Sequence, residues 1–256
     1  MTKRFSRAVV KRPCAEMVNG ITKAGLGKPD HELALKQHDS YIAALEKCGL
    51  EVEVIKADNR FPDSTFIEDT AVCTPHCAII TRPGAASRQK ETAGLKDILV
   101  KYYGIIEEIN SPSTLDGGDV MMVGDHYYIG MSERTNDEGA DQFISILKKY
   151  GMTGSKVEMK EMLHLKTGLS YLENNNLLIT GEFLKKPEFK IFNRIEIDPQ
   201  EAYSANSLWI NGTVIVPEGY SGTLEKIRSL GYETIITDTS EFRKLDGGLS
   251  CLSLRF

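Results

Sequence analysis

The chain has 256 residues, of which 26% are charged and 41% hydrophobic, and its net charge is −5. This composition is typical of a globular protein with a sizeable core, and without a long basic cluster it argues against nucleic acid as a partner. No apolar stretch approaches the length of a membrane span, and residues 1–5 lack the apolar core of a signal peptide. The five cysteines are irregularly spaced, which fits a reduced, cytoplasmic chain better than a disulfide framework.

Five segments share one local plan, in which two apolar strands flank a short polar turn. The first four cover residues 70–83, 119–132, 168–182 and 206–220, and the fifth is split between residues 251–256 and 5–13. Asn211-Gly212, between two β-rich runs, is the strongest hairpin signal among them. The sequence therefore predicts five β-hairpins, one of them assembled from both ends of the chain.

Between the hairpins, apolar residues recur every three or four positions, as in amphipathic helices. These segments cover residues 29–50, 87–103, 136–150 and 223–230, and strands are expected after them at 52–57, 105–110, 156–162 and 233–238. A unit of hairpin, helix and strand thus recurs at roughly 40–50 residues, a period typical of repeat and propeller architectures.

Five such units can close into a ring. Each unit alone buries too little apolar surface, and stacking neighbours around an axis would bury the rest. Pairing of the C-terminal strand with the N-terminal strand would close this ring and remove exposed sheet edges. No linker rich in Pro, Gly and Ser divides the chain, so we expect residues 1–256 to form one α/β domain.

Polar residues with useful chemistry stand at the start of every hairpin. If the units are equivalent, these side chains converge on one axis. They are Asp63, Glu68 and Asp69 for the first hairpin, Asp116 and Asp119 for the second, His164 for the third, Ser204, Asn206 and Ser207 for the fourth, and Cys251 for the fifth. The repeated motif Leu-Asp-Gly-Gly, at 115–118 and 245–248, supports this equivalence because glycine pairs allow sharp turns and close approach.

A cysteine, a histidine and a carboxylate suit nucleophilic catalysis, with the thiolate attacking and the histidine moving protons. Each residue alone has a plainer interpretation: a buried cysteine, a structural histidine or a turn-capping aspartate. Several acids around one pocket repel one another unless a cation joins them, and a planar guanidinium pairs well with carboxylates. Arg88 and Arg134 could then hold a substrate carboxylate, or could be solvated surface residues.

Cys73, His76 and Cys77 have spacing reminiscent of a metal site. They lie in a predicted hairpin turn and no fourth ligand pairs with them. We therefore expect no metal there and regard a turn with two half-buried cysteines as the better interpretation.

Six ordered motifs resemble the dimethylarginine dimethylaminohydrolase family of the guanidine-modifying (amidinotransferase) superfamily. The motifs are FPDSTFIEDTAV, AIITRPGAASRQKE, LDGGDVMMVG, YIGMSERTN, LHLKTGLSYL and LDGGLSCLSLRF, and together they span nearly the whole chain. The resemblance implies a five-bladed α/β propeller with pseudo-fivefold symmetry, built of ββαβ-type units.

The resemblance also implies roles for individual residues. Cys251 matches the nucleophile, His164 the general acid/base, and Asp116 the carboxylate that orients the histidine, a position where members vary between Asp and Glu. Asp63, Glu68 and Asp69 match the acidic substrate contacts, and Arg88 and Arg134 match the arginines that position the amino-acid end of the substrate. Ile21, within 20–27, matches the mobile lid, and Leu245 matches a backbone carbonyl that receives the substrate amine.

The expected activity is hydrolysis of Nω-methylated L-arginines to L-citrulline and dimethylamine or methylamine, through a covalent Cys251 intermediate. We expect neighbouring positive charges, the substrate included, to lower the pKa of the Cys251 thiol. No cofactor or catalytic metal is expected; the partner is a small cationic amino acid, and a homodimer is compatible with exposed elements at a propeller rim. The alternatives are arginine deiminase, an amidinotransferase, and a non-catalytic protein that binds cationic amino acids.

Overall fold

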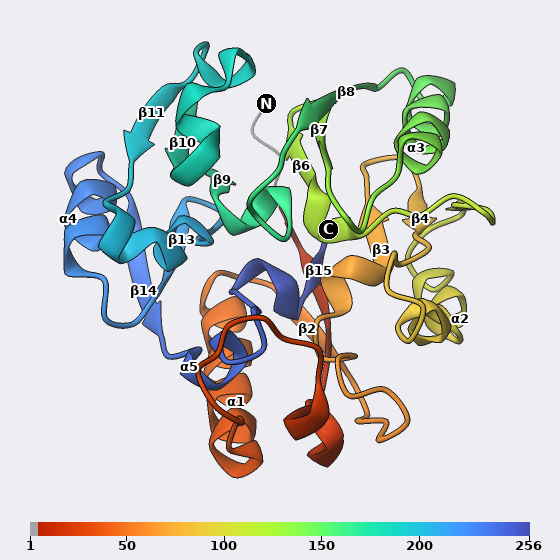
Figure 1. Cartoon of the computed structure of the whole chain (residues 1–256), viewed down its shortest axis with the longest axis horizontal. Helices are drawn as coiled ribbons and strands as arrows, with labels where there is room; N and C mark the ends of the chain where they lie inside the picture. The colour runs from red at the N-terminus through yellow and green to blue at the C-terminus, as the bar shows by residue number, and fades with distance from the viewer. Residues whose placement is uncertain (1–4) are drawn as a thin grey trace.

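A computed structural model describes residues 5–256. Residues 1–4, part of the segment that the sequence analysis considered for a signal peptide, lie outside the described residues. Five three-stranded sheets surround a common centre, with α-helices on the rim (Figure 1). None of the described helices is long and apolar enough to cross a membrane.

Each sheet has the same topology: its central strand pairs antiparallel with the first strand and parallel with the third. The sheets are β15-β1-β2, β3-β4-β5, β6-β7-β8, β9-β10-β11 and β12-β13-β14. The strands are β1 (Arg7–Lys11), β2 (Glu51–Ile55), β3 (Ala71–Cys73), β4 (Ala78–Ile80), β5 (Ile106–Glu108), β6 (Val120–Val123), β7 (His126–Met131), β8 (Thr153–Glu158), β9 (Leu169–Tyr171), β10 (Asn176–Ile179), β11 (Asn193–Glu196), β12 (Leu208–Ile210), β13 (Thr213–Pro217), β14 (Glu233–Thr237) and β15 (Leu254–Arg255).

The two ends of the chain share one sheet. β15 pairs antiparallel with β1, with Val9 opposite Leu254, and β1 pairs in parallel with β2. This sheet is one of the five blades, and because both ends of the chain contribute to it, it closes the ring. The five-bladed pseudo-fivefold α/β propeller expected from the sequence is confirmed.

Helices connect the second and third strands of most blades. The α-helices are α1 (His31–Lys47), α2 (Leu95–Leu99), α3 (Asp137–Lys149), α4 (Ser221–Ser229) and α5 (Ser240–Arg243). α3 is typical of the longer ones: the Asn136 side chain accepts a hydrogen bond from the Gly139 amide at its N-terminus, and Phe143 and Leu147 pack in a core with Tyr127 of β7. Capping and an apolar stripe of this kind explain why the sequence pattern located these helices well.

Two connections differ from the sequence-based expectation. The predicted helix over 87–103 is instead a 3₁₀ turn, Gln89–Thr92, followed by the short α2, because Gly94 between them adopts a φ of +81° that breaks helical geometry. Between β10 and β11 the chain makes two 3₁₀ turns, and Pro187 at the start of the second cannot donate a helical hydrogen bond. β11 itself was not predicted.

Short 3₁₀ turns precede the inner strands and pack on one another around the centre. η2 contacts η4 and η9, η4 contacts η5, and η5 contacts η8. Because each of these turns belongs to a different blade, polar residues far apart in sequence meet there. The 3₁₀ turns are η1 (Ala15–Asn19), η2 (Ile67–Thr70), η3 (Gln89–Thr92), η4 (Gly117–Asp119), η5 (Leu165–Thr167), η6 (Gly181–Lys185), η7 (Pro187–Phe189), η8 (Pro199–Ala205) and η9 (Ser250–Leu252).

Candidate active site

A small cavity lies where these turns meet. Of the ten residues to which the family resemblance assigned roles, eight line it, and Asp116 and Glu68 do not. The other polar residues expected at the centre, Asp119, Ser204, Asn206 and Ser207, do not line it either. The lining residues are Ile21, Asp63, Phe66, Asp69, Arg88, Arg134, Leu163, His164, Leu245, Asp246, Gly247 and Cys251.

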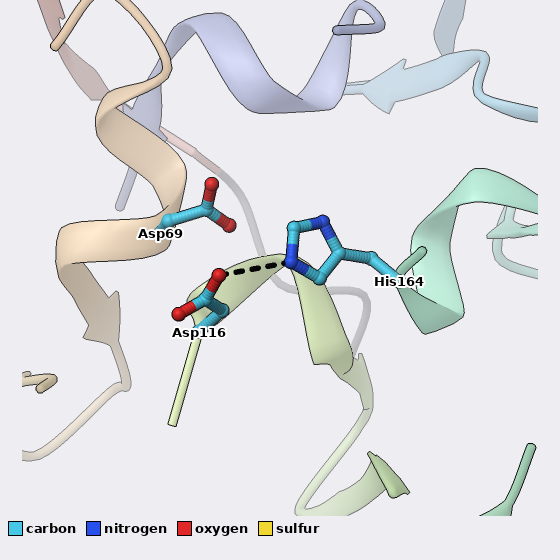
Figure 2. Close-up of side chains that lie close together, drawn as sticks. All are labelled: Asp69, Asp116 and His164. Carbon is cyan, nitrogen blue, oxygen red and sulfur yellow. Dashed lines mark hydrogen bonds and ion pairs between the residues drawn. The ribbon is translucent and has the colours of Figure 1, made fainter. Parts of the chain in front are cut away.

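His164 and Asp116 form a buried pair (Figure 2). The Nε2 atom of His164 lies 3.0 Å from Oδ2 of Asp116, whose Oδ1 accepts a hydrogen bond from the Gly84 amide at 2.8 Å. The aspartate, with its shorter arm, therefore reaches the imidazole and fixes its orientation from behind. A Cβ atom on Gly118 would lie 2.9 Å from His164 Nδ1, so the glycine of the Leu-Asp-Gly-Gly motif is needed for this ring position.

The carboxylates around His164 favour its protonated form. Burial lowers the pKa of His164, but the charges of Asp69 and Asp119 and the hydrogen bond to Asp116 outweigh it and raise the pKa to about 9. The side chain is therefore an imidazolium at neutral pH. With Nε2 directed at Asp116, Nδ1 is the nitrogen that can give a proton to a neighbouring ligand.

Cys251 is less acidic than the sequence analysis expected. Burial, together with the charges of Glu68 and Asp69, raises the pKa of its thiol to about 12, and a hydrogen bond from the Gly248 amide to Sγ offsets this only in part. Of the neighbouring positive charges expected to lower this pKa, Lys166 does so, but burial and the two carboxylates outweigh it. Arg88 and Lys166 are each paired with a carboxylate, which limits how far these two cations can stabilise the thiolate.

Arg88 holds the acidic segment in place. Its Nη1 donates to Asp69 Oδ2 at 2.5 Å, its Nη2 and Nε donate to Glu91, and Nη2 also donates to the backbone carbonyls of Asp63 and Phe66. Despite the desolvation cost of its burial, these carboxylates keep its pKa well above the usual range. Arg88 lines the cavity, but most of its donors are already used by the protein.

Asp69 and Glu68 are consecutive and point in different directions. Asp69 faces His164, and its Oδ1 accepts a hydrogen bond from the Gly118 amide at 2.9 Å (Figure 2). Glu68 lines a second cavity instead, where it pairs with Lys166 at 2.6 Å and Arg255 at 2.8 Å. The geometry therefore separates Glu68 from the other acids with which the sequence grouped it.

Phe66 supports the site and was not singled out in the sequence, whereas Asn206 was expected at the centre but had no assigned role. Phe66 lines the cavity, and its place inside the acidic motif was a usable signal because an aromatic face suits a cation. The Oδ1 of Asn206 accepts a hydrogen bond from the Ser250 amide at 2.8 Å, and its Nδ2 donates to the Lys166 carbonyl at 3.0 Å. This side chain therefore ties the turn after His164 to the turn that carries Cys251.

The segment 20–27 contributes Ile21 to the cavity lining and is held near it by hydrogen bonds. The Ile21 amide donates to Asp63 Oδ1 at 2.9 Å, while the Thr22 hydroxyl and the Lys23 amide both donate to Asp246 Oδ2, at 3.0 and 2.6 Å. The cavity has a volume of about 30 Å³, enough for one or two water molecules. This volume is too small for an arginine-sized ligand.

One group of side chains in residues 5–256 has the proximity of metal ligands: Asp69, Asp116 and His164, whose ligand atoms lie within 4.8 Å of one another. Each carboxylate already accepts a backbone hydrogen bond and has a cationic partner. Within the same range, Cys73, His76 and Cys77 do not form a group of this kind.

Comparisons with known proteins agree with this geometry. A family model described as eukaryotic N,N dimethylarginine dimethylhydrolase matches residues 20–196. The N(G),N(G)-dimethylarginine dimethylaminohydrolase of Pseudomonas aeruginosa is 54% identical over 98% of this chain and 100% of its own length. The enzyme of the same name from Streptomyces coelicolor is 35% identical over 97% of this chain and 96% of its own length.

Solved structures extend the similarity to three dimensions. The Pseudomonas aeruginosa enzyme, as a cysteine-to-serine mutant complexed with citrulline, superposes with a TM-score of 0.98 at 53% identity, covering 99% of this chain and 100% of that one. A histidine-to-glycine adduct of dimethylarginine dimethylaminohydrolase with S-methyl-L-thiocitrulline gives a TM-score of 0.97 at 53% identity, over 98% of this chain and 100% of that one. With near-complete coverage at more than half identity, and with a cysteine, a histidine and carboxylates gathered at one cavity, this chain belongs to the dimethylarginine dimethylaminohydrolase family.

Proposed function

We propose that this chain hydrolyses Nω-methylated L-arginines to L-citrulline and dimethylamine or methylamine. The observation that carries the proposal is the single cavity lined by Cys251, His164 and the carboxylates of Asp63 and Asp69, with Asp116 bonded behind the histidine. The relatives named for this activity, and the citrulline bound to one of them, support it.

The substrate's charge matches the charges of the cavity. A guanidinium placed between Asp63 and Asp69 could donate hydrogen bonds from the edges of its plane to both carboxylates, the geometry that these groups prefer. Burial raises the pKa of Asp63, which a bound cation would counteract. Arg134 lines the same cavity and is half-buried, so it can meet the substrate carboxylate, and the Leu245 carbonyl is available for the substrate amine.

Substrate binding activates the nucleophile. Burial and two carboxylates hold the pKa of Cys251 high, the carboxylates by repelling the thiolate. The attraction of a guanidinium beside Sγ would offset that repulsion. The thiol proton passes to solvent water, because His164 is already protonated. The Sγ lone pair then forms a bond with the guanidinium carbon while one C=N electron pair moves to nitrogen.

His164 then serves both halves of the reaction. Its Nδ1 proton passes to the methylated nitrogen, the C–N bond breaks, and dimethylamine or methylamine leaves a thiouronium group on Cys251. The neutral imidazole takes a proton from water, the hydroxide adds to the same carbon, and the C–S bond breaks to release L-citrulline. Asp116 stabilises the imidazolium at each stage, at the 3.0 Å distance to Nε2.

Arginine deiminase is the nearest alternative, because it needs the same constellation with ammonia as the leaving group. Structures of an N-terminal arginine dihydrolase domain share the fold with a TM-score of 0.86, at 19% identity, a likeness that extends to fold alone. A non-catalytic binding protein has no use for a thiol beside a buried imidazolium–carboxylate pair.

The decisive assay offers Nω,Nω-dimethyl-L-arginine and L-arginine to the purified protein in parallel and measures citrulline, dimethylamine and ammonia. We expect citrulline and dimethylamine in equal amounts, with little turnover of arginine. Cys251→Ser should reduce the rate by at least about 10³-fold, whereas Cys48→Ser, a buried cysteine outside the cavity, should not. Citrulline and ammonia from arginine alone would assign the chain to the deiminases instead.

A further inference from the structure

Asp119 is a fully buried carboxylate that takes no part in the mechanism above. It ends η4, three residues after Asp116, at the start of β6. Gly130 on the neighbouring β7 leaves room for it, because a Cβ atom there would lie 3.1 Å from Asp119 Oδ1. A carboxylate is costly to bury without partners, so its hydrogen bonds indicate what it does.

Both oxygens of Asp119 accept hydrogen bonds from segments that carry site residues. Oδ1 accepts from the Leu165 amide at 3.0 Å, directly after His164. Oδ2 accepts from the hydroxyls of Ser132 and Thr135, both at 2.6 Å, on either side of Arg134.

The two hydroxyls pass this connection on to the backbone. Ser132 Oγ accepts hydrogen bonds from the amides of Arg134 and Thr135, at 3.0 and 3.3 Å. Thr135 Oγ1 accepts from the Asp116 amide at 3.1 Å. A single carboxylate is thus linked, directly or through one hydroxyl, to the backbone beside or at three site residues.

We propose that Asp119 is a positioning residue that sets His164, Asp116 and Arg134 in register with one another. It joins the acid/base pair to the arginine expected to meet the far end of the substrate, and so couples the place of proton transfer to the place of substrate anchoring. This inference rests on the proposed function for the roles of those three residues, but not for the hydrogen bonds themselves.

Asp119 also contributes charge. Burial raises its pKa to about 6, against the opposing influence of His164 and the two hydroxyls, so the carboxylate is mostly ionised at neutral pH and above. The charged groups that face His164 are Asp69, Asp116 and Asp119, with Arg88 paired to Asp69 and the Cys251 thiol across the cavity. Removal of one of these three negative charges must therefore lower the pKa of His164.

Three variants separate the two contributions. Asp119→Asn keeps the size of the side chain and an oxygen for the Leu165 amide but removes the charge. Ser132→Ala and Thr135→Val keep the charge and each remove one hydroxyl link. Thr74→Val is the matched control, since Thr74 is equally buried and hydrogen-bonded but lies in the β3–β4 turn, away from the cavity.

Histidine NMR titration and steady-state kinetics give independent readouts. We expect Asp119→Asn to lower the pKa of His164 by about 1 and to move the alkaline limb of the pH–kcat profile to lower pH by the same amount. We also expect kcat/KM to fall by about 10-fold or more. Ser132→Ala should leave that titration unchanged and raise KM several-fold, because the Arg134 amide loses its acceptor.

An unchanged His164 titration in Asp119→Asn, together with kinetics of all three variants within twofold of Thr74→Val, would overturn the proposal. The NMR titration and calorimetric binding of citrulline need no turnover, so they test Asp119 even if methylarginine is not hydrolysed and the proposed function fails. If Asp119→Asn does not fold, by circular dichroism, the KM of Ser132→Ala and Thr135→Val decides: a value equal to the control in both overturns the proposal.

Discussion

Asp116→Asn tests the arrangement around His164 most directly. Asp116 accepts two hydrogen bonds, from the Gly84 amide at 2.8 Å and from His164 Nε2 at 3.0 Å. An asparagine has one acceptor oxygen, so one of the two buried donors must lose its partner, at a cost of about 1–3 kcal/mol. If the oxygen stays with Gly84, the amide NH₂ faces Nε2 and forces the neutral imidazole.

The rate should fall for two reasons that add. Loss of the negative charge lowers the pKa of His164, about 9 in the wild-type protein, by about 1–3, so half or more of the molecules lack the acidic imidazolium proton at pH 8. The neutral imidazole also carries its proton on Nδ1 when Nε2 accepts from the asparagine, so Nδ1 cannot take a proton from water. The two effects together should lower kcat by about 10²-fold or more at pH 8. Asp116→Glu, which keeps the charge and both acceptors, should lose far less.

The assay is citrulline release from dimethylarginine between pH 6 and pH 10, with folding checked by circular dichroism. Wild-type kcat should decline as the pH rises through about 9, where His164 loses the proton given to the leaving amine. A folded Asp116→Asn variant with kcat within threefold of wild type and the same alkaline limb would refute this reasoning.

Other expectations concern stability, the lid and the nucleophile. The pKa of His164 is raised in the folded protein from 6.5 to about 9. Its stabilising contribution is therefore complete below pH 6.5 and is lost as the pH rises through 9. The unfolding free energy, measured with denaturant, should fall by about 3 kcal/mol over this range, and His164→Gln should not show this fall. Asp246→Gly keeps the positive φ of 59° but removes the acceptor of the Thr22 hydroxyl, and should raise KM and speed tryptic cleavage of the lid several-fold. Glu68→Gln removes a charge that raises the pKa of Cys251, so alkylation by iodoacetamide at pH 8 should accelerate. The two partly buried cations left without this partner, Lys166 and Arg255, should lower the unfolding free energy by about 1–3 kcal/mol.

Much of the architecture could be predicted from the sequence because it depends on patterns that extend over only a few residues. Alternating strands and turn residues located the hairpins, and Asn211 with its φ of +51° does occupy the predicted turn between β12 and β13. The repetition of the unit implied a ring, and with it the gathering of polar side chains at the centre. The helix predicted over 87–103 failed because Gly94 adopts a left-handed conformation that apolar spacing does not reveal.

The direction of each side chain, by contrast, was settled only by packing between blades. Glu68 and Asp69 look equivalent in the sequence, yet η2 turns one toward Lys166 and Arg255 and the other toward His164. The acidity of Cys251 likewise depends on burial and on carboxylates from another blade.

The sequence by itself determined the repeating unit, the ring and the residue types at its centre, because hydrophobic periodicity and turn chemistry act over a few residues. Only the tertiary structure decided which of those groups are paired, which are buried and which carry a proton. Those properties depend on charges and hydrogen bonds between turns such as η2, η4, η5 and η9, which are far apart along the chain and adjacent only in the folded ring.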